Sequence, residues 1–301
     1  MDRERWGIMS IKSALPWQIK IAVKILLARL PASYRFWRWL GIFKAGDMER
    51  SEYALGVFSD HFNGVNFARK AGGFSTLEVG PGDTVSSALI ARAHGASQCY
   101  LVDAGRFARA DMVPYLELAE KLRSESFVVP EVASCESVDE LLRMCGGCYL
   151  TEGLCSFGTI PDQSVDFIWS QAVLEHVRKE DFVGTVREMY RVLSPQGVCS
   201  HRVDLKDHLG GALNNLRFSQ QTWESRFMTQ SGFYTNRIRY KEMLGIFEDA
   251  GFAVEVVHVA RFAKLPTPRW CLAPQFRSIP TDELLVSGFK VILRRQGASR
   301  A

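Results

Sequence analysis

The sequence predicts a doubly wound α/β domain built on a mostly parallel sheet of seven strands. Strand-like apolar runs alternate with amphipathic helical runs from about residue 71 onward. This order is expected when helices connect parallel strands and cover both faces of a sheet. A glycine turn follows the first strand. Apolar residues make up 47% and charged residues 23% of the 301-residue chain, which is ordinary for a globular protein.

Each element is predicted from its own stretch of sequence. Apolar runs predict strands at 75–79, 98–102, 148–151, 165–169, 197–203, 253–259 and 285–293. Helical periodicity predicts helices at 17–30, 107–123, 180–193 and 240–250. We expect a basic, Trp-rich helical extension over 1–70, followed by the α/β domain over 71–301 with an insert at about 205–239.

The turn after the first strand indicates an adenosine ligand. Residues 77–84 read LEVGPGDT, and the second apolar strand leads into Asp103. Glycines let the backbone approach a ligand, and an acid about 20 residues further on accepts hydrogen bonds from ribose hydroxyls. A dinucleotide site would have a third small residue where this chain has Val85. Glu78 and Asp83 place negative charge there, which favours the cationic S-adenosylmethionine over a pyrophosphate.

Two further segments make the pattern more specific. Residues 160–177 read IPDQSVDFIWSQAVLEHV, and residues 186–198 read VREMYRVLSPQGV. With the first motif, they resemble class I S-adenosylmethionine-dependent methyltransferases of the type-11 kind, which include the quinone-biosynthesis methylases. The resemblance covers about 71–294 and implies a Rossmann-like methyltransferase fold and an S-adenosylmethionine-dependent enzyme. The chain departs from the family at Gln196, where a glycine is usual, and in lacking a clear adenine signature after the third strand.

The resemblance also implies which residues hold the cofactor. Glu78, Gly80 and Gly82 would line the methionine part of S-adenosylmethionine, and Asp103 would hold the ribose. Glu152, just past the third strand, would contact adenine. Ser170 and Gln171, at the end of the fourth strand, would lie beside the methionine part, or would simply end the strand and cap the next element.

Four side chains are candidate bases for a hydroxyl acceptor, because imidazoles and carboxylates can take its proton. His176 follows the fourth strand, and the segment HRVDLKDH at 201–208 supplies His201, Asp204 and His208. Alternation along a strand places His201 and Asp204 on opposite faces. Asp204, Asp207 and His208 leave a metal site open as an alternative, although we expect no metal.

The acceptor is not fixed by these motifs. Aromatic, amide and guanidinium side chains over 209–239 suit a sugar ring, but they could equally pack an extra subdomain. We expect a hydroxyl of a sugar or glycan intermediate, because the N-terminal segment and HRVDLKDH resemble methyltransferases of bacterial surface polysaccharides. The alternatives are a quinone- or lipid-like ring, and a non-catalytic cofactor-binding or membrane-surface module.

The N-terminal region carries its own charge pattern. Residues 1–50 contain ten Lys/Arg against four Asp/Glu, and four of the seven tryptophans lie before residue 40. This stretch could be a lid over the cofactor or a peripheral contact with an anionic membrane, and we do not expect nucleic acid as a partner. Seven cysteines without a regular framework indicate free thiols and a cytoplasmic protein, with Cys145 and Cys148 at a turn rather than in a metal site.

Overall fold

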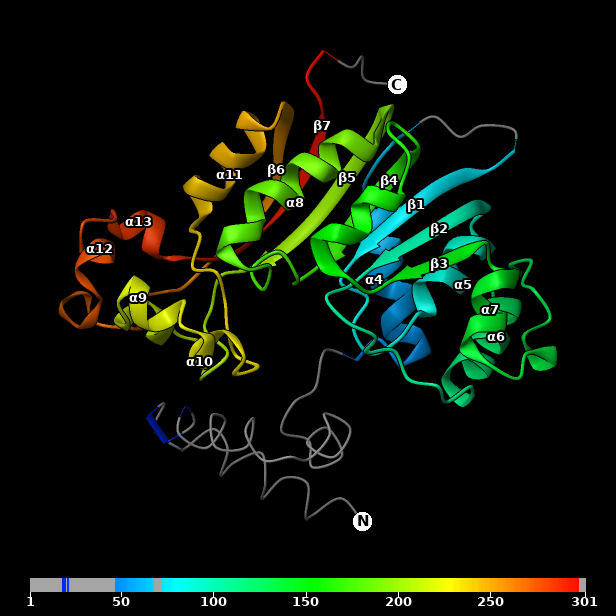
Figure 1. The fold of residues 1–301 in the computed structure, drawn as a ribbon, viewed down its shortest axis with the longest axis horizontal. Helices are drawn as coiled ribbons and strands as arrows, with labels where there is room; N and C mark the ends of the chain where they lie inside the picture. Colours follow the sequence, from blue (N-terminus) through cyan, green and yellow to red (C-terminus); the bar gives the residue numbers. More distant parts are fainter. Residues whose placement is uncertain (1–17, 20, 22–46, 68–71, 298–301) are drawn as a thin grey trace.

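The computed structural model describes residues 18–19, 21, 47–67 and 72–297. Its centre is one seven-stranded sheet in the order β3-β2-β1-β4-β5-β7-β6, with helices in front of and behind it in Figure 1. The strands are β1 (Phe74–Val79), β2 (Ala96–Val102), β3 (Gly147–Leu150), β4 (Val165–Gln171), β5 (Leu193–Asp204), β6 (Phe252–Arg261) and β7 (Val286–Arg295). All seven predicted strands are confirmed.

The sheet is parallel except at β7. The pairs β1–β2, β2–β3, β1–β4 and β4–β5 are parallel, and β7 runs antiparallel to both β5 and β6. The central strands are apolar on both sides: in β4 every residue from Val165 to Ser170 is buried. Burial on both faces is what parallel strands covered by helices require.

Helices cover both faces of this sheet. On one face, α4 (Ser51–Asn63), α5 (Ser86–Ala93), α6 (Val113–Ser124) and α7 (Val138–Met144) share a core with β1, β2 and β4. On the other face, α8 (Lys179–Val192) and α11 (Tyr240–Asp249) share a second core with the sheet. In α8, the side chains of Phe182, Val186 and Met189 are buried, and their spacing forms one helical stripe.

Helix α4 changes the expected domain boundary. Phe58 and Phe62 are buried in the first core, where Phe62 packs against Phe74 of β1 with ring centroids 5.3 Å apart. A boundary at residue 71 would therefore separate α4 from the core that it helps to form. The α/β domain has to begin no later than Ser51. The expected helix at 17–30 lies outside the described residues apart from residues 18–19 and Ile21.

The insert after β5 is a small helical layer. It contains the short helices η3 (Asn214–Arg217), α9 (Gln220–Trp223) and α10 (Arg226–Thr229), and it packs against η4 (Arg269–Cys271), α12 (Pro274–Arg277) and α13 (Thr281–Leu284). The remaining short helices are η1 (Val132–Ser134) and η2 (Gly153–Thr159). Ile21 is buried against Trp223 and its neighbours, so part of the N-terminal region contacts this layer.

The cysteines and the helix lengths bear on two smaller expectations. All seven cysteines are free, and the buried Cys145 caps α7 just before a turn at Gly146 with φ +64°. The expected turn between α7 and β3 is therefore present. Within the described part of the chain, no helix is both long and apolar enough to span a bilayer.

Candidate active site

The topology fixes where a ligand would bind. From β1 the chain winds outward through β2 and β3, and it then returns to β4 on the other side of β1. Ligands of open α/β sheets bind at the carboxyl ends of the strands beside such a reversal. The turn after β1 lies there: Gly80 has φ +74°, and a Cβ on it would lie only 2.4 Å from Cγ1 of Val173. Only glycine fits this position without strain.

Asp103, at the end of β2, is bonded to the glycine turn. Its Oδ2 accepts a hydrogen bond from the Gly82 amide at 2.9 Å, and its Oδ1 accepts one from the Ala104 amide at 2.7 Å. Burial raises the pKa of this carboxyl, while the two amide hydrogen bonds oppose that rise. The structure thus brings together Gly80, Gly82 and Asp103, as the sequence predicts.

Glu78 lies inside the same site. Its side chain is buried, and its Oε2 accepts a short hydrogen bond from the Ser87 hydroxyl of α5. Desolvation is the main cause that raises the pKa of Glu78 to about 8, and the nearby Asp103 carboxylate adds to it. A cationic ligand would reverse this effect by favouring the ionised carboxylate.

The other three residues expected at the cofactor differ in their surroundings. Glu152 is exposed, just beyond β3. Gln171, half-buried at the end of β4, lies with its Oε1 at 3.0 Å from Nε2 of His61. Ser170 is fully buried, with its hydroxyl 2.8 Å from Nδ1 of His201. The hydroxyl of Ser170 is therefore engaged inside the protein rather than directed to a ligand.

His201 does not reach the open edge of the sheet, contrary to its expected role as a base. Its ring is fully buried and stacks on Phe247 of α11, with centroids 6.4 Å apart. Desolvation lowers the pKa of His201 to about 3. Alternation along β5 separates it from Asp204, since the two residues pair with Val291 and Gly288 of β7. Burial beneath α11 leaves the His201 nitrogens no route to an acceptor.

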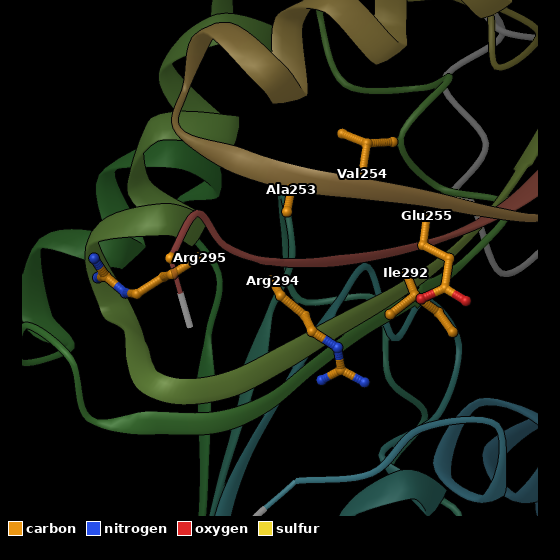
Figure 2. Close-up of a pocket in the computed structure, with 7 residues that line it drawn as sticks. Ala253, Val254, Glu255, Ile292, Arg294 and Arg295 are labelled. Carbon is orange, nitrogen blue, oxygen red and sulfur yellow. The ribbon is translucent and has the colours of Figure 1, made fainter. Parts of the chain in front are cut away.

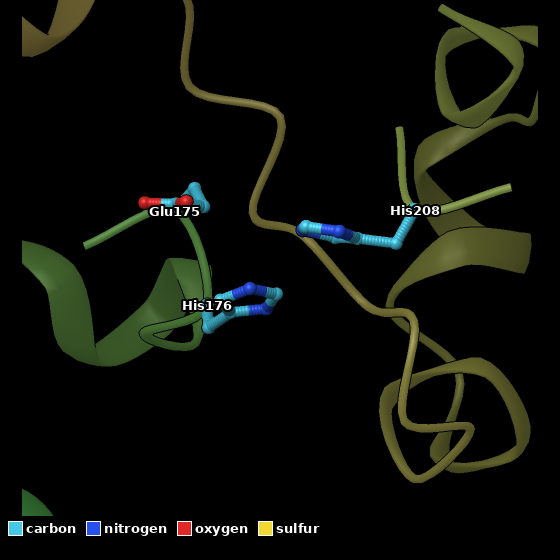
Figure 3. Close-up of side chains that lie close together, drawn as sticks. All are labelled: Glu175, His176 and His208. Atoms are coloured by element: carbon cyan, nitrogen blue, oxygen red, sulfur yellow. The ribbon is translucent and has the colours of Figure 1, made fainter. Parts of the chain in front are cut away.

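Two of the four candidate bases, His176 and His208, converge with Glu175, and the backbone of Asp204 lies beside them. The rings of His176 and His208 stack with centroids 4.7 Å apart. Glu175 accepts a hydrogen bond at Oε1 from the Asp204 amide at 3.2 Å. One ligand atom from each of Glu175, His176 and His208 lies within 4.8 Å of the other two. Figure 3 shows the side chains of Glu175, His176 and His208. We call these three residues, with Asp204, the rim cluster. The spacing of the three ligand atoms could also hold a divalent ion.

Asp207 belongs to the loop and not to this cluster. Its Oδ1 accepts hydrogen bonds from the amides of Leu209 and Ala212, and its Oδ2 accepts one from the amide of Asn214. Three backbone amides thus hold this carboxylate in the loop. Asp207 is therefore not among the residues whose ligand atoms come together at Glu175, His176 and His208.

Two site residues were missed at the level of sequence. Glu175 adjoins His176 in LEHV, and the pattern gave no reason to treat it separately. His61 is buried on α4, with Nδ1 at 2.8 Å from the Ser200 hydroxyl and Nε2 facing Gln171. The 3.6-residue spacing of Ala54, Phe58 and His61 was a usable helix signal, but it did not indicate a partner at the end of β4.

A surface hollow of about 160 Å³ lies elsewhere (Figure 2). It is lined by the start of β6 and the end of β7, including Ala253, Ile292 and Arg294. Because β7 is antiparallel and Arg294 pairs with Val198 near the start of β5, this hollow is at the amino-terminal edge of the parallel strands. It is therefore not the cofactor site.

The central part of the chain matches a known protein family. Residues 77–200, from β1 into β5, match the family model described as a methyltransferase domain. The chain is a class I S-adenosylmethionine-dependent methyltransferase. S-adenosylmethionine is the methyl donor of this methyltransferase, and the segment matched contains Glu78, both glycines of the turn and Asp103. No curated protein matches the methyltransferase in sequence.

Several solved structures are similar to this chain at a low level. An S-adenosylmethionine-dependent methyltransferase from Mesorhizobium loti is 18% identical with a TM-score of 0.41, over 76% of this chain and 94% of that one. The YcgJ protein from Bacillus subtilis is 16% identical with a TM-score of 0.44, over 82% and 100%. A phosphoethanolamine N-methyltransferase 2 from Haemonchus contortus, solved with S-adenosylhomocysteine, is 15% identical with a TM-score of 0.43, over 81% and 53%. At such low similarity, these structures do not bear on the acceptor.

Proposed function

We propose that the methyltransferase acts on a hydroxyl oxygen, and that the acceptor is a sugar or glycan intermediate. The observation that carries the proposal is the environment of His176. Its Nδ1 lies 2.8 Å from the Tyr234 carbonyl, which can only accept a hydrogen bond. The proton of the neutral ring is therefore on Nδ1, and the lone pair is on Nε2.

The state of His176 suits a general base. The ring is solvent-accessible, yet the surrounding protein desolvates it and thereby lowers its pKa. The imidazole is neutral at neutral pH and ready to accept a proton. The Asp204 carboxylate opposes the lowering of the pKa, so it would stabilise the imidazolium once the proton has moved.

In the proposed reaction, the methyl group moves from the sulfonium sulfur to the acceptor oxygen. A bond forms between the acceptor oxygen and the methyl carbon as the bond from that carbon to the sulfonium sulfur breaks, and the sulfur keeps the electron pair as S-adenosylhomocysteine. The hydroxyl proton passes to Nε2 of His176. Most of the rate would come from alignment of the two reactants, with the base contributing a further factor of about 10²–10⁴.

The insert contributes less to the acceptor proposal than its composition indicates. Trp223 and Asn215 are buried, and Asn215 bonds the Thr235 hydroxyl at 2.9 Å. The side chain of Arg237 is also buried, donating to the Phe218 carbonyl at 2.7 Å. These groups pack the insert, so support for a polar acceptor comes from the rim cluster and the sequence resemblance.

The test is methyl transfer from radiolabelled S-adenosylmethionine to a panel of sugars, glycan intermediates and quinols. We expect labelled O-methyl sugars, and a His176→Ala variant should lose about 10²–10⁴ in kcat while S-adenosylhomocysteine binds as before. The matched control is His258→Ala, because His258 is exposed on β6 and should leave kcat unchanged. Labelling of quinols alone would overturn the sugar assignment. Equal kcat in the His176→Ala and wild-type enzymes would overturn the assignment of His176 as the base.

A further inference from the structure

The edge strand β6 is uncovered in the described part of the chain. It ends the sheet, with β7 as its one neighbour. Val256 and Val257 are 36% and 51% exposed, unlike the buried strands at the centre. A long, partly apolar edge with unpaired backbone groups is a template for another strand.

The sequence of β6 is symmetric about its midpoint. Residues 253–260 read AVEVVHVA. Reversed against a second copy, alanine faces alanine, valine faces valine, and each Glu255 faces a His258. A two-fold axis places each residue of a strand opposite its symmetry mate in the other copy, and in this register a carboxylate acceptor on Glu255 faces an imidazole N–H donor on His258.

Such pairing needs opposed residues to point to the same face of the sheet. In a regular strand, residues an odd number of positions apart, such as Glu255 and His258, point to opposite faces. A regular β6 could therefore not pair with its own copy in this register. In β6 the register shifts between Val256 and His258, where Val257 forms a bulge. Glu255 pairs with Ile292 and His258 pairs with Lys290 on β7. Since those two β7 residues share a face, Glu255 and His258 do so as well.

The other opposed pairs obey the same rule. Val254 and Val259 pair with Leu293 and Phe289, which lie on the α11 face. Ala253 and Ala260 pair with Arg294 and Gly288, which lie on the α4 face with Ile292. Figure 2 shows Ala253 and Glu255 on one side of β6 and Val254 on the other. The bulge therefore brings every opposed pair of a two-fold dimer onto a common face.

We propose that the methyltransferase forms a two-fold dimer in which β6 pairs antiparallel with β6 of a second copy. The two seven-stranded sheets become one continuous sheet across the axis. The pairing leaves the candidate active sites uncovered, because they lie at the carboxyl ends of β1, β4 and β5, and β7 separates these strands from β6.

The test is sedimentation equilibrium of the full chain and of single variants. We expect a wild-type dimer, and a Val257→Lys variant whose dissociation constant rises at least tenfold because a charge enters the centre of the pairing. Val128→Lys is the matched control, since Val128 is 88% exposed and lies far from β6 in the fold. A monomeric wild type, or equal weakening by both lysines, would overturn the dimer.

A cross-link tests the register separately from stability. With Glu255→Cys and His258→Cys in one chain, oxidation should join two chains, because the proposed register places each new thiol opposite the other type in the partner. The control combines Glu255→Cys with Ala253→Cys. It also carries two new thiols, but in the proposed register neither lies opposite a new thiol of the partner. Equal cross-linking of both pairs would overturn this register, and S-adenosylhomocysteine binding by each variant would show that the site is folded.

Discussion

His61 and Gln171 join helix α4 to the carboxyl end of strand β4. The Nε2 of His61 lies 3.0 Å from Oε1 of Gln171, which ends β4, and the Nδ1 lies 2.8 Å from the Ser200 hydroxyl on β5. One buried ring on α4 thus contacts two neighbouring strands, β4 at its last residue and β5 at Ser200.

Protonation of His61 should loosen this connection. Desolvation lowers its pKa to about 4, below the value of about 6.5 in an unfolded chain. The folded state then binds fewer protons, so its stability is complete above pH 6.5 and is lost as pH falls toward 4. We expect the free energy of unfolding to fall less steeply over this window in a His61→Gln variant than in wild type, by up to about 1.4 kcal/mol per pH unit. Urea unfolding at several pH values measures both slopes, and equal slopes in wild type and His61→Gln would contradict this role of His61.

Asp103 should control cofactor affinity. An Asp103→Ala change removes the acceptor of the Gly82 amide and the expected partner of the ribose, so we expect affinity for S-adenosylhomocysteine to fall at least tenfold, or about 1.4 kcal/mol. Calorimetry measures this, with NAD as a comparator that should not bind. Asp103→Asn keeps an oxygen for the Gly82 amide and separates the turn from the ribose contact. Unaltered binding by both variants would remove Asp103 from the site.

Gly80 should tolerate no side chain. In Gly80→Ala the new methyl group would meet Val173 at 2.4 Å, and such overpacking costs about 1–3 kcal/mol. Gly211→Ala is the matched control, because Gly211 has a similar φ of +73° with open space around it. A larger loss of stability at Gly80 than at Gly211, partly restored by Val173→Ala, would isolate the clash from the backbone strain.

His201 should be dispensable for methyl transfer. Because its ring is buried against Phe247 and bonded to Ser170, a Ser170→Ala, His201→Phe double variant replaces a buried polar pair by apolar groups of similar shape. We expect unchanged kcat and a change in unfolding free energy below about 1.5 kcal/mol. A stable double variant that has lost activity would return His201 to the list of bases.

A divalent ion should inhibit the enzyme if His176 is the base. An ion held by Glu175, His176 and His208 would occupy the lone pair that must accept the proton. We therefore expect Zn²⁺ to lower kcat, EDTA to restore it, and His208→Ala to weaken the inhibition. Loss of activity in EDTA, with recovery on added metal, would show instead that the cluster is a metal centre.

Much of this fold could be predicted because its signals are local. Strand bounds follow from apolar runs, and the glycine turn followed by Asp103 fixes the cofactor edge. The choice of face in β5 could not be predicted: alternation separates His201 from Asp204 but does not say which side α11 covers. The insert shows the same limit, since Trp223 and Arg237 are typical of a binding surface by residue type. Their burial depends on distant parts of the chain: Trp223 shares a core with Ile21, and Arg237 lies over the ring of Phe276.

The place of α4 has a practical consequence. An expression clone designed to start at residue 71, where the recognisable motifs begin, would lack Phe58 and Phe62 and would leave Phe74, Phe167 and Trp169 facing water on one side of the sheet. Such a fragment should be recovered mainly in inclusion bodies, although it retains every residue of the methyltransferase motif. The shortest usable fragment has to include the helix that begins at Ser51.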